Sequence, residues 1–346
     1  MELDFDRLLS FVQKMAPRCR ILVAGDVMLD KYYYGEVNRI SPEAPVPINH
    51  ITHQKETLGG AANVAHNLAR LGCQTSIAGF VGDDYHCQTL TEKFVARGIN
   101  FRGLVTTNRP TTTKMRIIGG HQQMMRLDFE DTRPMEAMYI DRFLNYIQRS
   151  LDGSLDALVL SDYGKGALAD YASHEIIKAA HAHGVPVVVD PKGAHWTKYT
   201  GADYITPNVK EINEILLDPI ANEDVPVVKA ANYLRRKYKI KNILATRSEN
   251  GVTLVREGEA LHIPTRAQEV FDVSGAGDTV IAVLAAGISG GLKGTEAAYL
   301  ANLAASVVVA KLGTYAVSQE ELEQALHQQQ KQESVAKACV YEEKKG

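Results

Sequence analysis

The sequence predicts an α/β protein in three layers, with a mostly parallel central sheet, helices on both of its faces, and a small separate β-sheet. Two observations predict this class. Short apolar segments alternate along the 346 residues with segments whose apolar side chains follow helical spacing, and repeated strand-then-helix units form parallel sheets covered on both faces. Further β-like segments interrupt this alternation in two places, which indicates strands outside the central sheet.

The first strand is expected at Arg20–Asp26, an apolar run that ends in Gly-Asp. The first long helix is expected at Gly60–Leu71, where apolar residues follow helical spacing and Gly72 ends the pattern. The other central strands are expected at Thr75–Val81, Ala157–Ser161, Val185–Asp190 and Asn242–Thr246. The other helices are expected at His86–Ala96, Glu136–Arg149, Tyr171–His183, Val227–Lys237, Gly277–Gly290 and Thr295–Leu312.

The two interrupting stretches predict a small sheet of their own. Lys31–Val37 and Val46–Thr52 have the pattern of strands joined by a Pro-rich turn, and Thr111–Ile118 and Gln122–Asp128 flank the turn signal Gly119-Gly120. A small sheet inserted into an α/β core suits a lid over an active site. The alternative is an edge extension of the main sheet that has no gating role.

We expect one main domain over residues 1–317, with lid segments inserted at about 31–53 and 108–130. A C-terminal helix and a polar tail or linker are expected at 318–346. This region opens with a match to a capping box, Ser318-x-x-Glu321, and then turns polar, so that a frayed helix or a linker is predicted.

Composition and charge exclude several classes. Lys and Arg number 38 against 41 Asp and Glu, so the net charge of -3 offers no basic excess for nucleic acid. The longest strongly apolar run, Val280–Ile288, is far shorter than the ~20 residues of a spanning helix. The acidic N-terminus does not suit a signal peptide, and the four cysteines form no C-x-x-C pair. We therefore expect a cytoplasmic protein with free thiols and with no nucleic-acid or membrane partner.

The strongest local motif is Asp272–Thr279, which reads DVSGAGDT and precedes an apolar helix. Glycines at 275 and 277 allow the amides of Gly275, Ala276 and Gly277 to converge on an anion at the helix N-terminus. Asp278 lies in that first turn, where its carboxylate can accept a hydroxyl proton while the amides stabilise a transferring phosphoryl group. The alternative is that Asp278 only interacts with the helix dipole.

Other glycine motifs fit less well. The dinucleotide-binding fingerprint G-x-G-x-x-G matches Gly275 and Gly277, but its third glycine falls at position 280, which is Val280. The P-loop pattern G-x-x-x-x-G-K-[ST] is absent. An NAD-dependent oxidoreductase is therefore the last of the alternatives, and a P-loop kinase is excluded.

A second motif, Leu58–Asn63, reads LGGAAN at the start of a helix. Gly59 and Gly60 permit close approach of the backbone to a ligand, and the Asn63 amide can bind hydroxyl groups with both of its ends. The alternative is a simple turn at the two glycines.

A third motif, Thr206–Glu211, places Asn208 and Glu211 three residues apart on one helix face. The pair can hold a hydrated Mg²⁺ and a nucleotide phosphate, because Mg²⁺ prefers oxygen ligands and retains water. The alternative, equally good locally, is a capping box in which Asn208 is the N-cap.

Together and in this order, the motifs resemble those of the ribokinase-like (PfkB) sugar kinases, over about residues 18–316. The resemblance implies the ribokinase-like fold, ATP and Mg²⁺ as cofactors, and a monovalent cation such as K⁺ as a further candidate. It implies ATP contacts at Asn208, Glu211, Thr246, Ser248, Gly251 and Asn302. One departure is that Thr246-Arg-Ser248 stands where the family often has Thr-x-Gly, so the local geometry there is in question.

A narrower resemblance is to the D-glycero-β-D-manno-heptose 7-phosphate kinases of lipopolysaccharide-core synthesis. It is carried by the segments 25–32, 39–47, 122–130, 162–166 and 190–193. It implies ATP-dependent phosphorylation of the anomeric oxygen to give the 1,7-bisphosphate. Many of these kinases are fused to a C-terminal adenylyltransferase, which we expect to be absent from these 346 residues.

A phosphorylated acceptor needs cations, and four lie in motifs expected to face the cleft: Arg116, Arg126, Lys165 and Lys192. Arginine suits bidentate phosphate recognition and lysine acts as a point charge. Each has the alternative of a solvated surface charge. Asp30 matches the family's carboxylate for sugar hydroxyls.

The resulting hypothesis is a heptose 7-phosphate kinase that forms a homodimer through the β lid. The alternatives are a kinase of another sugar or sugar phosphate, and a non-catalytic protein that senses nucleotides or sugars. Asp278 together with Asn208 and Glu211 argues against the sensor, because a sensor needs no general base.

Overall fold

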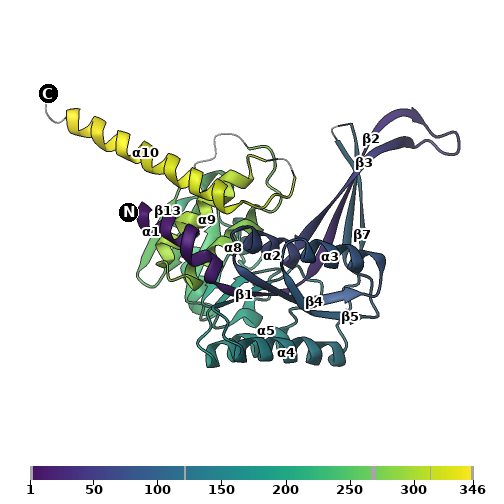
Figure 1. The fold of residues 1–346 in the computed structure, drawn as a ribbon, viewed down its shortest axis with the longest axis horizontal. Coiled ribbons are helices and arrows are strands. Elements are labelled where there is room, and N and C mark those ends of the chain that lie inside the picture. Colours follow the sequence, from purple (N-terminus) through teal and green to yellow (C-terminus); the bar gives the residue numbers. More distant parts are fainter. Residues whose placement is uncertain (1–2, 121, 266–269, 312, 344–346) are drawn as a thin grey trace.

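The structure is a computed structural model that describes residues 3–120, 122–265, 270–311 and 313–343, and a central sheet forms the core of its body (Figure 1). In these residues its order is β13–β12–β11–β10–β9–β8–β1–β4–β5. The strands from β11 to β5 are parallel, whereas β12 and β13 add antiparallel at one edge. The bounds are β1 (Arg20–Gly25), β4 (Gln74–Gly82), β5 (Asn100–Thr107), β8 (Ala157–Ser161), β9 (Val187–Asp190), β10 (Tyr204–Ile205), β11 (Asn242–Thr246), β12 (Val252–Arg256) and β13 (Glu259–Ile263).

Helices cover both faces of this sheet, as predicted. One face carries α1 (Phe5–Ser10), α2 (Ala61–Arg70), α3 (Tyr85–Val95), α8 (Ala276–Ser289), α9 (Gly294–Val308) and the start of α10 (Gln319–Glu343). The other carries α4 (Ala137–Asp152), α5 (Asp170–Ala182), α6 (Val209–Asn213) and α7 (Asp224–Lys237). Strand β1 shows why two cores form: Ile21 and Val23 join the first, and Leu22 and Ala24 the second, because successive strand residues point to opposite faces.

Most of the predicted elements are present, and strands β8 and β11 have the predicted bounds. The edge strands β5, β12 and β13, the short β10, and α1 were not predicted. The helix expected to reach Leu312 ends at Val308, and Leu312 itself lies outside the described residues. The predicted capping box forms, with reciprocal hydrogen bonds between Ser318 and Glu321. The expected C-terminal helix is present as α10, which continues to Glu343, and the polar tail or linker stays a prediction.

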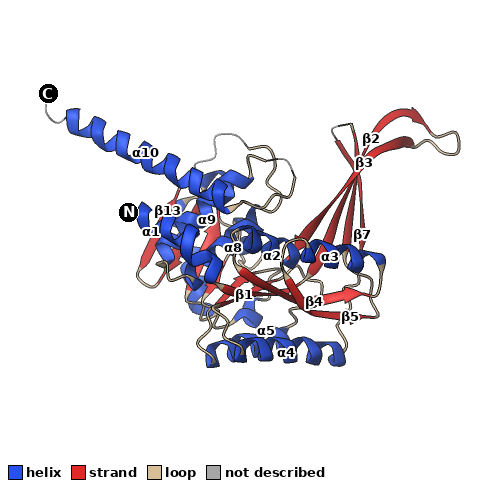
Figure 2. Ribbon diagram, in the orientation of Figure 1, coloured by secondary structure: helices blue, strands red, loops and turns tan. Residues whose placement is uncertain are grey.

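The lid is a sheet of its own, in the order β3–β2–β6–β7. Its strands are β2 (Val27–Ile40), β3 (Pro47–Gly60), β6 (Thr113–Gly119) and β7 (Gln122–Phe129), and Figure 2 shows them projecting together from the body of the molecule. Strands β2 and β6 are parallel, and both outer pairs are antiparallel. None of the four pairs with the central sheet in the described residues, so the alternative of an edge extension was wrong.

Two further observations concern the described part of the chain. No helix there is both long and apolar enough to cross a membrane. Cys19, Cys73 and Cys87 are free thiols.

Candidate active site

The first turn of α8 positions the predicted base. Gly275 is the N-cap residue with φ 82°, a left-handed conformation that favours glycine. A Cβ there would also lie 3.0 Å from Nδ2 of Asn63, so a larger residue would crowd the side chain that binds Asp278. The helix begins at Ala276, and Asp278 follows in its first turn.

The Asp278 carboxylate is buried and is held by two side chains from other elements. Asn63 on α2 donates to Oδ2 across 2.6 Å, and the Tyr163 hydroxyl donates to Oδ1 across 2.7 Å. Burial raises the pKa of Asp278 to about 6, and the two hydrogen bonds oppose this rise. The carboxylate therefore does more than interact with the helix dipole, and its pKa differs from that of an ordinary aspartate.

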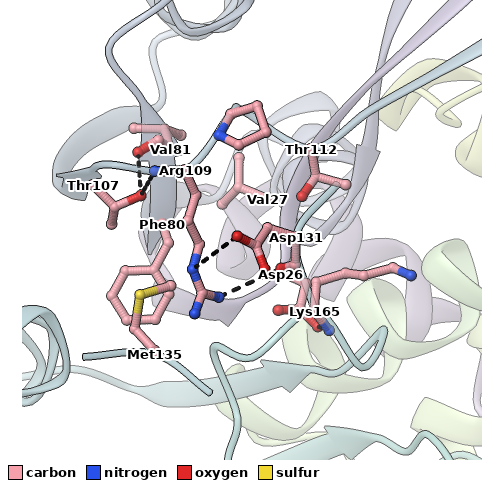
Figure 3. A pocket seen from close by; sticks show the side chains of 11 residues that line it. Asp26, Val27, Phe80, Val81, Thr107, Arg109, Thr112, Asp131, Met135 and Lys165 are labelled. Carbon is pink, nitrogen blue, oxygen red and sulfur yellow. Dashed lines mark hydrogen bonds and ion pairs between the residues drawn. The ribbon is translucent and has the colours of Figure 1, made fainter. Parts of the chain in front are cut away.

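Tyr163 was missed by sequence reasoning as a functional residue, although the segment 162–166 was noted. Its loop is fixed by Asp26, between β1 and β2, whose carboxylate accepts backbone N–H groups from Tyr163 at 2.8 Å, Lys165 at 3.0 Å and Ala167 at 3.1 Å. Figure 3 shows Asp26 in a small pocket, from which the side chains of Lys165 and Arg109 extend in different directions. One buried carboxylate thus orders the backbone that carries both Tyr163 and Lys165.

The lid presents a charged face to Asp278. Register pairing places Asp30, Lys114 and Asp128 side by side across β2, β6 and β7. The charges of Asp30 and Lys114 both act on the pKa of Asp278, the former raising it and the latter lowering it. The charged lid face and the first turn of α8 therefore lie close enough for their charges to interact.

Close packing around Asp30 explains the predicted glycine pair. A Cβ on Gly59 would lie 2.5 Å from Oδ2 of Asp30, a distance that no side chain can occupy. Gly60 has φ 54°, and a Cβ there would lie 2.6 Å from the carbonyl oxygen of Asp26. The two glycines therefore leave the space that Asp26 and Asp30 occupy, in addition to forming a turn.

The four predicted phosphate-binding cations all form ion pairs. Arg116 contacts Asp30 at 2.6 Å, and Arg126 binds Asp128 through two contacts of 2.8 Å. Lys165 and Lys192 pair with Glu130 at 2.8 Å and Glu211 at 3.3 Å respectively. Arg116 and Arg126 lie on the lid and Lys165 on the adjoining loop, whereas Lys192 lies beside Glu211. Sequence reasoning missed Lys114, which only the strand register brings to this face.

A cavity of about 460 Å³ lies on the other side of the first turn of α8. Its lining includes six residues predicted from sequence: Thr246, Ser248, Gly251, Ala276, Gly277 and Asn302. A Cβ added at Gly277 would meet open space, so the backbone of this turn faces the cavity. Apolar residues such as Val252, Val280 and Val309 form much of the remaining lining, as a site for a planar base requires.

Ser248, which stands where the family often has glycine, has the backbone conformation that a glycine would readily adopt there. Ser248 has φ 52°, within the left-handed region that glycine adopts readily, and its carbonyl accepts the Gly251 N–H at 3.0 Å. Gly251 itself has φ 74°, and a Cβ there would lie 2.1 Å from the carbonyl oxygen of Ile263. Asn302 fixes the same segment by donating to the carbonyl of Pro264 at 2.9 Å.

Asn208 and Glu211 do not line this cavity but lie at the adjacent strand end, where Asn208 forms a parallel bridge with Thr246. The capping box is formed: Glu211 N–H donates to Asn208 Oδ1 at 2.9 Å, and Asn208 N–H donates to Glu211 Oε2 at 3.0 Å. Asp190, which sequence reasoning missed as a site residue, lies near them. Burial, with the charges of Asp278 and Glu211, raises the pKa of Asp190.

These oxygen atoms suit a hydrated metal ion better than an enclosed one. In the described residues no group of three or more His, Cys, Asp or Glu side chains gathers to hold a metal. Mg²⁺ needs no such cage, because it usually keeps several waters and binds one or two carboxylates together with substrate phosphates. Glu211, already engaged by Asn208 and Lys192, can act on such an ion through water.

Comparison with known proteins places most of the chain in one family. Residues 20–341 match the model of the pfkB family carbohydrate kinase. The bifunctional protein HldE of Methylobacillus flagellatus is 45% identical over 320 residues, covering 92% of this chain and 65% of that protein. The HldE protein of Erwinia tasmaniensis is 45% identical over 311 residues, covering 90% and 64%. The chain thus spans about 65% of the length of these curated relatives.

Solved structures share the fold at lower identity. A ribokinase from Arabidopsis thaliana, complexed with ribose and ATP, superposes with a TM-score of 0.70 at 20% identity and covers 89% of this chain and 98% of that one. Phosphofructokinase-2 from Escherichia coli, in complex with substrates and products, gives a TM-score of 0.74 at 17% identity and covers 90% and 98%. The predicted three-layer fold with a β lid is therefore confirmed.

Proposed function

The chain belongs to the pfkB family of carbohydrate kinases, and from this premise we propose that it phosphorylates the anomeric hydroxyl of D-glycero-β-D-manno-heptose 7-phosphate with ATP. The observation that carries the proposal is the position of Asp278. Its helix turn borders the 460 Å³ cavity, while its carboxylate responds to the charges of the lid residues Asp30 and Lys114. The nature of the acceptor comes from the narrower sequence resemblance and from the cations of the lid.

Proton transfer to Asp278 accompanies the proposed reaction. The acceptor hydroxyl loses its proton to a carboxylate oxygen of Asp278 as its oxygen forms a bond to the γ-phosphorus of ATP. The bond from that phosphorus to the β–γ bridging oxygen breaks, and ADP leaves. The backbone N–H groups of Gly275, Ala276 and Gly277 are placed to stabilise the charge on the transferring group. A base with a pKa near 6 is ionised at neutral pH and still accepts a proton effectively.

The cavity beside α8 is the proposed ATP site. Ser248 and Gly251 shape the loop that meets the nucleotide, and Asn302 lies where the family resemblance puts the adenine. Asn208 and Glu211 are proposed to hold a hydrated Mg²⁺ at the phosphate end, in addition to forming the capping box. Mg²⁺ bound there would neutralise negative charge on the phosphates.

A substrate panel tests the acceptor. Purified protein with ATP and Mg²⁺ is given heptose 7-phosphate, the free heptose, ribose, fructose and other sugar phosphates, with ADP release as the readout and ³¹P NMR to identify the new phosphate. The proposal predicts fastest turnover of heptose 7-phosphate and a new anomeric phosphate. Faster turnover of another sugar would change the assigned acceptor. If none of the sugars causes ADP release, the sensing protein is favoured.

We also propose a homodimer formed through the lid. Met125, Leu127 and Phe129 alternate along β7 and are 57%, 40% and 45% exposed. They lie on the sheet face opposite Arg126 and Asp128, because side chains of a strand alternate between faces. An exposed row of large apolar side chains on a projecting sheet suits an interface. For the location we propose the cytoplasm, where free thiols stay reduced.

A further inference from the structure

We propose that Lys114 is the main determinant that selects an acceptor carrying its own phosphate group, with Arg126 and Lys165 completing a site for a phosphate dianion. The inference deepens the proposed function and rests on it, because it assumes that the acceptor enters between the lid and Asp278. Lys114 belongs to none of the sequence motifs that pointed to a kinase.

The strand register places Lys114 at the centre of the charged lid face. Lys114 on β6 stands between Asp30 on β2 and Asp128 on β7. The next row on the same face contains Tyr32, Arg116 and Arg126, because residues two apart in a strand point to one side. The Nζ of Lys114 lies 5.7 Å from the ring centre of Tyr163, the residue that holds Asp278. Lys114 thus faces the acceptor site next to the base.

The other cations around the site are already neutralised by carboxylates. Arg116 is committed to Asp30 and Arg126 to Asp128, while Lys165 and Lys192 pair with glutamates. Within the described residues Lys114 forms no such ion pair. An incoming anion therefore gains most at Lys114, because elsewhere it competes with a carboxylate that is already in place.

Burial makes that unpaired ammonium group responsive to an anion. Lys114 is half-buried, and its pKa is lowered first by desolvation and then by the charges of Lys165 and Arg126, while Asp30 and Asp128 oppose this change. Lys165 and Arg126 are therefore close enough to repel Lys114. A ligand of charge near −2 that is bound between these residues of β6, β7 and the loop after β8 relieves the repulsion on Lys114. A phosphate ester at neutral pH carries such a charge.

Arg116 has a different role in this arrangement. Its guanidinium contacts Oδ1 of Asp30 at 2.6 Å and lies 5.0 Å from the ring centre of Tyr32. These contacts orient the carboxylate proposed to bind sugar hydroxyls, so Arg116 is a positioning residue. Selection of a phosphate on the acceptor is left to Lys114, Arg126 and Lys165.

The test compares two acceptors that differ only in the phosphate. The ratio of kcat/KM for heptose 7-phosphate to kcat/KM for the free heptose is measured in the wild type, Lys114→Met, Lys114→Arg and the control Lys178→Met, which removes an exposed charge on α5. Lys114→Met is expected to reduce the ratio about tenfold to hundredfold, the range for a lost charge-assisted contact. Lys114→Arg should recover most of the ratio, and Lys178→Met should not change it. The KM for ATP should stay near the wild-type value throughout.

Several outcomes would overturn the inference. One is a wild type with no preference for the phosphorylated acceptor. Another is a Lys114→Met variant whose kcat/KM falls by the same factor with both acceptors, which would mean that Lys114 serves the transferring group or the fold. Calorimetric titration of both acceptors without ATP makes the same comparison independently of turnover. If Lys114→Met fails to fold, Lys114→Gln is used in its place. If the wild type prefers a different sugar phosphate, the heptose assignment fails, and the same ratio measured on that sugar decides the role of Lys114.

Discussion

Nδ2 of Asn63 donates a hydrogen bond to Oδ2 of Asp278 across 2.6 Å, and so joins the first turn of α2 to the first turn of α8. The two residues are 215 positions apart in the sequence. This bond connects the Gly-Gly segment, which packs against Asp30, with the turn that borders the proposed ATP cavity. The acceptor side and the phosphoryl side of the site therefore share one rigid contact.

Asp278→Asn is expected to lower kcat at least ~10²-fold, because the amide cannot accept the hydroxyl proton. The same change should stabilise the protein at pH 7. The pKa of Asp278 is about 6 in the folded state against a model value of 3.8, so the free energy of unfolding falls as pH rises through this range. That difference corresponds to at most about 3 kcal/mol. Activity assays and thermal melts at pH 7 check both effects; a variant with near wild-type kcat would exclude Asp278 as the base.

Tyr163→Phe should move the pH dependence of kcat. Only the ionised carboxylate accepts a proton, so kcat of the wild type is expected to rise with pH through about 6 and to level off above. The Tyr163 hydroxyl lowers the pKa of Asp278, so its removal shifts the rising part of the profile to higher pH. Tyr171→Phe, at an exposed site on α5, serves as the control. An unchanged pH profile in Tyr163→Phe would mean that the protonation of Asp278 does not limit kcat at low pH.

Gly59→Ala should weaken acceptor binding selectively. The added methyl group would lie 2.5 Å from Oδ2 of Asp30 and must displace that carboxylate. Loss of its charged hydrogen bond to the sugar is expected to raise the KM for the acceptor about tenfold or more, with the KM for ATP nearly unchanged. Gly153→Ala, at the end of α4 with φ -86° and no contact under 3.4 Å, should leave both constants unchanged. Equal changes in both KM values would point to a general disturbance of the fold.

Glu211→Gln separates the metal role from the helix cap. The amide oxygen can still accept the Asn208 N–H, so the capping box and the melting temperature should be retained. The lost charge should raise the Mg²⁺ concentration needed for half-maximal activity and lower the activity. Glu214→Gln, at the exposed C-cap of the same short helix, controls for loss of a nearby charge. A lower melting temperature with unaltered Mg²⁺ dependence would leave Glu211 with only its structural role.

Leu127→Glu and Met125→Glu should convert the proposed dimer to a monomer. Each substitution places a charge in the exposed apolar row of β7, which a buried interface tolerates poorly. Light scattering after size-exclusion chromatography gives the mass of each species. Met138→Glu, at an exposed site on α4 outside the lid, should leave the wild-type mass unchanged. A monomeric wild type would remove the lid from consideration as an interface.

The sequence allowed good prediction where periodicity or a motif was local. The bounds of Ala157–Ser161 and Asn242–Thr246 follow from short apolar runs, and the GAGD turn forms as its glycines require. The strand Glu259–Ile263 was missed because only its last residue is fully buried, so it shows little apolar pattern. The polar segment after Leu326 shows no amphipathic period either, yet α10 continues through it.

Contacts between distant segments were beyond sequence reasoning. Tyr163 meets Asp278 across 115 positions, and no local pattern connects them. Lys114 lies in the segment Thr111–Ile118, whose strand character was predicted, but its facing depends on the register with β2. A single-residue change in that register would turn Lys114 away from the site.

The three amides held by Asp26 also have a consequence for the size of the substrate. Tyr163, which touches the base, and Lys165, proposed to bind the acceptor's phosphate, are two residues apart on a loop that one buried carboxylate fixes. The backbone positions of Tyr163 and Lys165 are therefore fixed relative to one another, and only their side chains adapt to a ligand. An acceptor shorter by one carbon would place its phosphate farther from Lys165 while its hydroxyl is at Asp278, so the fixed loop contributes to discrimination by carbon-chain length.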